Sequence, residues 1–559
     1  MKRTIPLTLV ALAIGLGTAA SAQRYLTEVF SDANLTITPD VTYGTNIDFL
    51  TSNFASPLVP TDIGTLQTLV STMQPIPAPY FDPADGSTAV KVTNIRMDVY
   101  QPSQGVDVLT ARPLVIYLHT GNALPPPING SPNGARKDST AVEICKRMAR
   151  RGYVAVSMSY RLGWNPLATT EIARRASLLN AVYRALQDVR ECTRVLKADA
   201  AGANTYAIDP NKIIVLGEGT GGYIALANAT LDNPAELFIE KFRLDPFDPT
   251  VSVVDTAQVG NIYGYNGALT LYRPNGQNAT AQFCVNMGGA LADSTWLAAG
   301  DAPMVAFHTV FDPFAPFTDG IVIVPTTGGP VVNVQGSNYF MRLVNQFGNN
   351  NSFVNLPNSD PFTARARALY GTTQTHGTNA VTINTNVEGL FPMVRPLWPA
   401  PAQEEASPWQ FWDQNSALAQ TVVSAGPPPI TANIASLASN PDMSPTKART
   451  YIDTVMAYLN PRIVCALQLG PCSLVGIDEE ASSSAVEVWP NPATENFTVN
   501  SGNTIVRRYR VLDINGREVA TNSVNAARFT VARNGLAPGT YFLELTLNDG
   551  RLVRKVMLD

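Results

Sequence analysis

Ile208-Asp-Pro-Asn-Lys-Ile-Ile-Val-Leu-Gly-Glu-Gly-Thr-Gly-Gly222 is the stretch that decides the fold. Its apolar run, Lys212–Leu216, predicts a strand buried on both faces, and the glycines after it lead into a predicted helix over Tyr223–Leu231. Upstream, strands are predicted over Asn94–Tyr100, Pro113–His119 and Tyr153–Ser159. Helices are predicted between and after them, over Asp138–Arg151 and Glu171–Ala198. This alternation predicts an α/β fold with a doubly wound, mostly parallel sheet and helices on both of its faces.

Downstream, the pattern is less regular. Strands are predicted over Gln282–Met287 and Pro303–His308, and a helix over Thr446–Leu459. Residues 317–405 are rich in Asn, Thr and Pro and are expected to be irregular, either as a lid or as a structural insertion. An acidic, serine-rich stretch at 476–485 is typical of a linker. Beyond it, short alternating runs with turn residues predict a small all-β sandwich.

The N-terminus has the pattern of an export signal. Lys2 and Arg3 precede the apolar run Ile5–Gly17, and Ala20-Ser-Ala22 is a small-residue cleavage site. The apolar run is too short to span a membrane comfortably, and no later run reaches spanning length. We therefore expect residues 1–22 to be removed and the exported chain to have no transmembrane anchor.

Composition narrows the classes of function. The chain has 559 residues, of which 45% are hydrophobic and 15% charged, with a net charge of −5. This composition predicts globular domains, and the lack of a basic stripe argues against nucleic-acid binding. No CxxC pair and no His-rich cluster exists, so neither a metal site nor a cofactor is predicted.

Five cysteines are present, so at least one is unpaired within the chain. Cys465 and Cys472 bracket a short loop containing Gly and Pro and are the candidate disulfide, because export permits disulfides. Their Cα atoms should then lie near 5.5 Å apart. The alternative is two unrelated buried thiols.

Residues 486–559 resemble the type A C-terminal sorting domain of the type IX secretion system. The matching motifs stand in a fixed order: Trp489-Pro-Asn-Pro492, Asp513-Ile-Asn-Gly-Arg517, Leu536-Ala-Pro-Gly-Thr-Tyr541 and the basic pair Arg554-Lys555. The resemblance implies that the type IX machinery carries the protein across the outer membrane and that the module is then typically removed. The protein would end outside the cell or on its outer surface.

Residues 94–232 resemble carboxylesterase-type α/β hydrolases, which implies an α/β-hydrolase-like domain over 23–475. Tyr117-Leu-His-Thr-Gly-Asn122 stands where such esterases carry a His-Gly-Gly-Gly oxyanion motif, and Ser159-Tyr-Arg-Leu-Gly163 matches their Tyr-Arg-Leu. In the strand order of that fold, the connections before and after the strand Tyr153–Ser159 run in opposite directions across the sheet. Right-handed crossovers then place the two helices on opposite faces, with Cys145 and Cys192 far apart and unbridged.

The resemblance also places the nucleophile. Active members carry Gly-x-Ser-x-Gly on a strained strand-to-helix turn, whereas this chain has Gly217-Glu-Gly-Thr-Gly221, with Gly219 at the nucleophile position. Glycine cannot form an acyl-enzyme, and loss of a catalytic serine costs on the order of 10⁶ in turnover elsewhere. Thr220 is either a displaced nucleophile or a helix-capping hydroxyl. With Gly121 and Asn122, its backbone N–H is expected to form an oxyanion-type pocket.

The other triad positions are partly filled. Asp312 holds the acid position at the end of a predicted strand, with a structural loop-closing role as the alternative, and His308 matches a structural histidine. The loop that should carry the catalytic histidine is expected at Asn386–Pro392, with Leu390 in its place. His376 is the only downstream histidine, and the alternative is a plain surface residue.

Two functions from different classes fit this pattern. One is a secreted or surface-bound, non-catalytic protein that uses the hydrolase scaffold to bind a small, ester-like molecule. The other is a carboxylic-ester hydrolase with an altered nucleophile. The fold alone does not choose between them.

Overall fold

The structure is a computed structural model that describes residues 24–324, 327–358, 360–400, 402, 404–470, 472, 486–502, 504–513, 518–547 and 551–559. The expected signal peptide and linker lie outside the described residues. The chain divides into two compact units, Met1–Leu356 with Phe362–Ser473, and Leu474–Asp559 with Pro357–Pro361.

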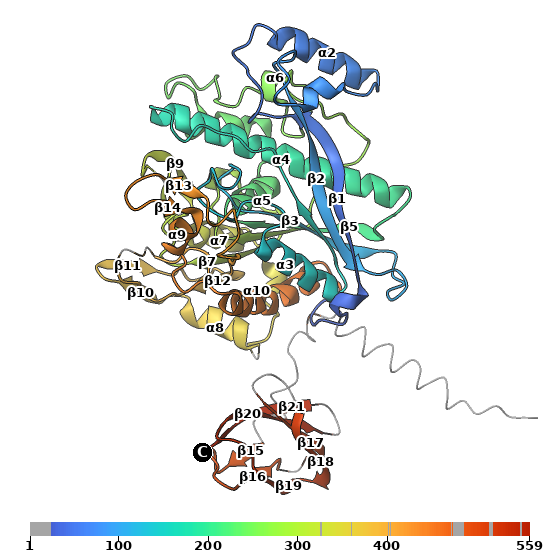
Figure 1. Cartoon of the computed structure of the whole chain (residues 1–559), viewed down its shortest axis with the longest axis vertical. Helices are drawn as coiled ribbons and strands as arrows, with labels where there is room; N and C mark the ends of the chain where they lie inside the picture. The colour runs from blue at the N-terminus through green and yellow to red at the C-terminus, as the bar shows by residue number, and fades with distance from the viewer. Residues whose placement is uncertain are drawn as a thin grey trace, which may run out of the picture. The chain divides into compact units, whose positions relative to one another are not determined.

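The first unit is built on an eight-stranded sheet with the order β1-β2-β4-β3-β5-β6-β7-β12. Neighbouring strands from β4 to β12 run parallel, whereas β1 and β2 add two antiparallel pairings at one edge. Figure 1 shows β1 beside β2 at this edge. The strands are β1 (Leu35–Ile47), β2 (Val92–Pro102), β3 (Arg112–Leu118), β4 (Val154–Met158), β5 (Ile208–Glu218), β6 (Phe283–Met287), β7 (Met304–Thr309) and β12 (Leu390–Met393). This is the mostly parallel α/β-hydrolase sheet that the sequence predicts.

Helices connect these strands and cover the sheet. The α-helices are α2 (Val59–Ser71), α3 (Ser139–Arg150), α4 (Glu171–Ala201), α5 (Thr220–Thr230), α6 (Thr256–Val259), α7 (Ser337–Gln346), α8 (Pro361–Leu369), α9 (Ala432–Leu437) and α10 (Pro445–Ala466). Short 3₁₀ helices cover Asp32–Asn34, Ala78–Phe81, Pro234–Phe238, Glu240–Phe242, Ser294–Trp296 and Asn351–Phe353.

The helices α3 and α4 lie on opposite faces of the sheet. Leu114 and Ile116 of β3 share one core cluster with Cys192 of α4, whereas Val115 of β3 and Cys145 of α3 are buried outside that cluster. Successive strand residues point to opposite faces, so this division separates the two helices. The expected placement is confirmed, and both cysteines are free.

The expectation that residues 317–405 are irregular is wrong. The segment holds α7, α8 and two hairpins, β8 (Asp319–Ile323) with β9 (Pro330–Gln335) and β10 (Thr373–His376) with β11 (Asn379–Thr382), and it also holds β12. β12 has only four residues, contains Pro392, and pairs with β7 alone at the sheet edge. An edge strand tolerates proline, but such a strand is too short to give a periodic signal. A third small hairpin, β13 (Val422–Ser424) with β14 (Ile430–Thr431), precedes α9.

The last helix of the unit runs further than the sequence predicts. α10 continues past Leu459 and through Pro461 to Ala466. Beyond the proline, Arg462 donates to Glu388 across 2.6 Å, and Ile463 and Val464 are buried, so packing holds this last turn and a half. Cys465 at its end is bridged to Cys472, with the Cα atoms 4.9 Å apart.

The second unit consists of two small antiparallel sheets. One has the order β15-β16-β19 and the other β18-β17-β20-β21. Its strands are β15 (Glu487–Trp489), β16 (Asn496–Asn500), β17 (Val506–Leu512), β18 (Glu518–Ala526), β19 (Arg528–Ala532), β20 (Gly539–Thr546) and β21 (Arg551–Leu558). Side chains of both sheets, among them Val499 and Leu543, form one apolar core. Among the described residues of the chain, no helix is long and apolar enough to cross a membrane.

Candidate functional site

The site centres on the turn between β5 and α5. β5 ends at Glu218, α5 begins at Thr220, and Gly219 between them has φ 53° and ψ −114°. A Cβ on Gly217 would overlap the carbonyl oxygen of Gly221, and a Cβ on Gly221 would overlap the carbonyl oxygen of Leu118 at the end of β3. The flanking glycines are therefore required by close backbone approach, as in a nucleophile turn.

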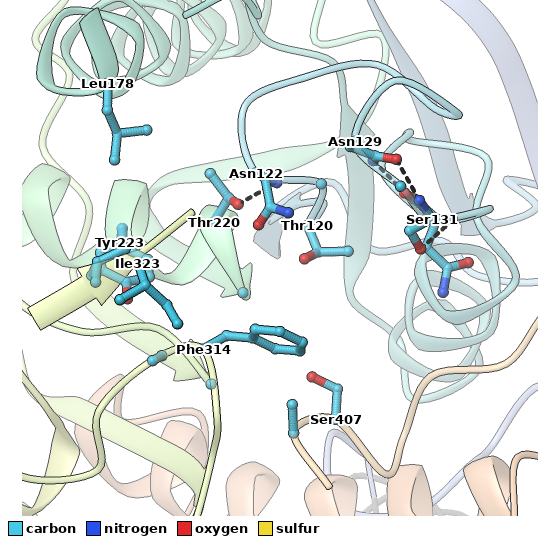
Figure 2. A pocket seen from close by; sticks show the side chains of 18 of the residues that line it. Thr120, Asn122, Asn129, Ser131, Leu178, Thr220, Tyr223, Phe314, Ile323 and Ser407 are labelled. Carbon is cyan, nitrogen blue, oxygen red and sulfur yellow. Dashed lines mark hydrogen bonds between the residues drawn. The ribbon is translucent and has the colours of Figure 1, made fainter. Parts of the chain in front are cut away.

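Thr120 occupies the space beside the side-chain-free residue. A Cβ built on Gly219 would overlap Oγ1 of Thr120 and lie 3.1 Å from the Thr120 Cβ. Thr120 follows β3 and points toward the turn from the loop that carries Asn122 (Figure 2). Sequence reasoning did not single it out, although the signal was present, because a threonine stands where the resembling motif has its first glycine after histidine. A threonine hydroxyl thus lies where the missing side chain would begin.

Thr220 ties the start of α5 to the same loop. Its Oγ1 accepts a hydrogen bond from the backbone N–H of Asn122 across 2.8 Å (Figure 2). The backbone N–H of Thr220, in the first turn of α5, makes no hydrogen bond to another described residue. Gly121, Asn122 and Thr220 all line one cavity. The structure therefore brings the expected oxyanion-type residues together, but the Asn122 N–H already has the Thr220 hydroxyl as its acceptor.

Glu218 fastens a second loop beneath the turn. Its buried carboxylate accepts hydrogen bonds from the Tyr117 hydroxyl (2.5 Å), Trp409 Nε1 (2.9 Å) and Gln410 Nε2 (2.8 Å). Burial raises the pKa of this carboxyl group. Tyr117 belongs to β3, whereas Trp409 and Gln410 belong to the loop after β12, which the sequence did not assign to the site.

Asp312 lies at the cavity, in the loop after β7. Its Oδ1 accepts hydrogen bonds from the N–H groups of Phe314 (2.8 Å) and Ala315 (3.0 Å). Burial raises the pKa of Asp312 to about 7 against the effect of these two bonds. His308 at the end of β7 lies with Nδ1 2.8 Å from the Ser337 hydroxyl and Nε2 3.1 Å from the Ala315 carbonyl oxygen. Burial lowers the pKa of His308 to about 4, so it is a neutral residue that orders this loop.

The expected place of the histidine loop needs correction. Asn386–Pro392 does not form a loop at the site, because Leu390 begins β12 and is fully buried in the core. The loop that follows β12 reaches the cavity further along, where Ala406, Ser407 and Gln410 line it. Thr309 Oγ1 donates to the Ala406 carbonyl oxygen across 2.8 Å and holds this loop beside the end of β7. Ser407 thus lies on the loop that follows β12, and it lines the cavity.

The structure does not bring His376 to the site. It ends β10, where its Nδ1 lies 2.7 Å from Glu404 Oε2 and its ring stacks on Phe311 at a centroid distance of 4.1 Å. None of the chain's three histidines, all of which are described, lines the cavity. The cavity lining therefore offers no imidazole to activate a hydroxyl.

The cavity has a volume of about 900 Å³ and is mostly apolar in its lining. It extends from the turn toward α4 and α5 on one side and toward the loop of Asn129 and Ser131 on the other (Figure 2). Asp312 is the only Asp or Glu among the described lining residues, and no His, Lys or Arg among them lines the cavity. No group of three His, Cys, Asp or Glu among the described residues is arranged to hold a metal ion.

Comparisons with known proteins agree with this geometry. Residues 97–321 match the BD-FAE family, and residues 487–559 match the secretion system C-terminal sorting domain. The chain joins a BD-FAE α/β-hydrolase domain to a secretion-system sorting domain. The sorting domain indicates secretion to the cell surface or exterior and implies an interaction with the type IX machinery.

Among solved structures, the chain is similar to esterase 2 of Thermogutta terrifontis with propionate bound. The two share 16% identity over 40% of this chain and 71% of that one, with a TM-score of 0.26. It is also similar to MGS-M1, an α/β hydrolase from a Medee basin deep-sea metagenome library, with 16% identity over 40% of this chain and 67% of that one and a TM-score of 0.23. No curated protein matches the chain. The BD-FAE domain thus places the protein among esterase-like α/β hydrolases. The family match does not show whether the protein is catalytic, so that question depends on the residues of the site.

Proposed function

We propose that this protein is a non-catalytic binding protein, secreted or held at the cell surface, which uses the BD-FAE domain to hold a small carbonyl-bearing molecule. The observation that carries the proposal is the pair Gly219 and Thr120. The backbone keeps the turn of a nucleophile, while the space for the nucleophile's side chain is taken by a threonine hydroxyl from the opposite loop.

The remaining machinery suits binding better than turnover. An acyl transfer needs a nucleophile and a base within hydrogen-bond reach of it. None of the chain's three histidines lines the cavity, so it has no histidine base, and the Thr220 hydroxyl accepts a hydrogen bond from the backbone N–H of Asn122.

One backbone donor for a carbonyl oxygen remains at the turn. The N–H of Thr220 at the start of α5 has no acceptor among the described residues, and the eleven-residue helix behind it adds the positive end of its dipole. Preorganised donors of this kind bind a carbonyl oxygen without needing a serine. The site can therefore hold an ester or ketone without cleaving it.

The test compares binding with turnover on the same molecules. Native mass spectrometry measures complexes of the full chain with a panel of neutral esters, and gas chromatography measures their hydrolysis. A fluorophosphonate serine probe is applied in parallel. We expect stable complexes, negligible hydrolysis and no covalent labelling. Hydrolysis well above the rate in buffer, abolished by a substitution in the cavity, contradicts the proposal.

A second function has one observation in its favour. The Thr120 hydroxyl lies at the nucleophile position, so an ester hydrolase with a displaced nucleophile remains the competing reading. Thr120→Ala and Thr220→Ala separate the two candidate hydroxyls. If either substitution removes an activity of the unmodified chain, the protein is a hydrolase with an altered nucleophile.

A further inference from the structure

The cavity has two chemically different arms that meet at the turn. Figure 2 shows Thr120, Asn122 and Thr220 between Leu178 and Ile323 on one side and Asn129 and Ser131 on the other. A ligand that fills the cavity must therefore be amphiphilic, and its two parts can be read from the two linings.

The first arm is apolar and enclosed. One face of α4 lines it from Leu179 through Val182 to Leu186, which is about 10 Å along the helix axis. Further apolar lining comes from α5, the short 3₁₀ helices and the neighbouring loops: Ala227, Leu231, Phe242, Ala292 and Trp296. Most of these side chains are buried from solvent, so the arm runs into the core and not along the surface. A flexible apolar chain fits such a space because burial in it gains the hydrophobic free energy of each methylene.

The second arm is polar but uncharged. Its amides and hydroxyls come from the loop after β3, the loop after β12 and the region of α9: Asn129, Ser131, Asn133, Ser407, Gln410, Ser436 and Asn440. The same segments also contribute apolar side chains between these groups, among them Ile128, Val422 and Ile430. Several of these already contact one another, such as Ser436 and Ser131 with their hydroxyls 3.1 Å apart. Small hydroxyls and amides in this density suit a partner that both donates and accepts, such as an alcohol.

The ligand must also be neutral. The three segments that supply most of the mouth and the polar arm, 120–135, 320–341 and 414–441, contain no charged residue, although charged residues make up 15% of the chain. The one carboxyl group in the lining belongs to Asp312, whose side chain is 2% exposed, and no Lys, Arg or His among the described lining residues could balance an anionic ligand. A free fatty acid or a phosphate ester is thereby disfavoured against an uncharged ester.

We propose that the cavity binds a neutral monoacyl ester of a small polyol, with the acyl chain in the arm along α4, the ester carbonyl at the Gly219 turn and the hydroxyl-bearing head in the arm of Asn129 and Ser131. This inference names the ligand class of the site described above and rests on the proposed binding function.

The experiment titrates the full chain with monoacylglycerols from acetyl to palmitoyl, below their aggregation concentrations, and follows the fluorescence of tryptophan, since Trp164 and Trp296 line the cavity. We expect affinity to rise about threefold to fourfold per methylene until the arm is filled. The free fatty acid and the methyl ester of the same chain should each bind at least about tenfold more weakly, because one is charged and the other lacks the hydroxyls.

Val182→Trp fills the apolar arm and should weaken binding of the long-chain ester at least about tenfold while leaving the acetyl ester nearly unchanged. The matched control is Val108→Trp on a surface loop, where the side chain is 85% exposed and does not line the cavity. If Val182→Trp does not fold, Leu178→Trp at the cavity wall serves in its place.

Equal affinity at all chain lengths, tighter binding of the fatty acid, or equal behaviour of Val182→Trp and Val108→Trp overturns the ligand class. Hydrolysis of the same monoacylglycerols, measured in parallel, is a separate outcome. Chain-length-dependent binding followed by turnover would overturn the non-catalytic function and keep the ligand class. Binding of short esters only, unaffected by Val182→Trp and without turnover, would overturn the ligand class and keep the non-catalytic function.

Discussion

Two residues on facing loops decide the chemistry of this site. Gly219 keeps a positive φ at the tip of the turn, a conformation that costs a non-glycine residue about 1–3 kcal/mol, and Thr120 fills the space beside it. Placing a serine at Gly219 therefore does not by itself restore a nucleophile, because the Thr120 hydroxyl already occupies the space for its side chain.

Gly219→Ser alone is expected to destabilise the domain without restoring activity. The new Cβ would overlap the Thr120 hydroxyl, and overpacking with backbone strain lowers the free energy of unfolding by about 1–3 kcal/mol. Thermal denaturation of the single variant measures the loss, and Thr120→Gly with Gly219→Ser should recover part of it. A single variant as stable as the parent would show that Thr120 moves aside freely.

Restoring hydrolysis requires a base as well as a nucleophile. Leu390 is buried in β12, so a histidine belongs at Ser407, on the loop that reaches the cavity. We expect Thr120→Gly, Gly219→Ser and Ser407→His together to give burst-phase acylation by an activated ester, about 10²-fold or more above the variant without the histidine. The matched control puts histidine at Leu390 in place of Ser407. Equal rates for the two histidine variants would contradict the placement.

Asp312 should make the stability of the domain depend on pH. Burial raises the pKa of Asp312 in the folded chain to about 7, well above the ordinary value of an aspartic acid, so folding favours the protonated form. The stabilising contribution is complete below about pH 4 and is lost as pH rises toward 7. Asp312→Asn keeps the oxygen that accepts from Phe314 and Ala315 but cannot ionise. Between pH 4 and pH 8 the variant should therefore gain on the order of 1 kcal/mol or more relative to the parent, measured as the shift in the domain's calorimetric transition. A constant difference across this range would argue that Asp312 is ionised throughout.

At the scale of the elements, the sequence predicts the buried parallel strands well and the edge of the sheet poorly. β3, β4 and β5 are continuous apolar runs followed by helical periodicity, and this signal is local. β12 depends on pairing with β7, and a four-residue strand with a proline has no periodicity of its own. Because β12 was not predicted, the histidine loop was expected at the wrong place. For the same reason, Ser407 and Gln410 were not predicted as site residues. Thr120 was hidden for a different reason, because its role depends on contact with a turn about a hundred residues away.

Glu218 holds three elements together, and its removal should show this. Glu218→Ala leaves the Tyr117 hydroxyl, Trp409 Nε1 and Gln410 Nε2 without their acceptor, and unsatisfied buried donors cost about 1–3 kcal/mol each before relaxation. We expect chemical denaturation to show a loss of about 2–4 kcal/mol for Glu218→Ala. Glu218→Gln retains an acceptor and should lose much less. Similar losses for both would mean that the packed volume, and not the hydrogen bonds, holds the loop after β12.

At the scale of the whole molecule, the two units have separate tasks. The apolar core around the eight-stranded sheet is made by the first unit's residues, and the core of the two small sheets is made by the second unit's. Every described residue that lines the cavity belongs to the first unit. A chain that loses residues 486–559 therefore keeps every described residue that lines the cavity.

The final prediction follows from this separation. A chain that ends before residue 486 should keep the thermal transition of the BD-FAE domain within a few degrees, because no core residue of that domain is lost.

In its native cell, this shortened chain should remain within the envelope instead of reaching the exterior, since residues 487–559 form the sorting domain. The intact gene should yield external protein that lacks residues 1–22 and most of 486–559, as read by mass spectrometry. A chain without residues 2–22 is the control and should stay in the cytoplasm with its sorting domain uncleaved. Truncated protein recovered outside the cell in normal amounts would show that another segment directs export, whereas a lowered thermal transition would show that the two units stabilise each other.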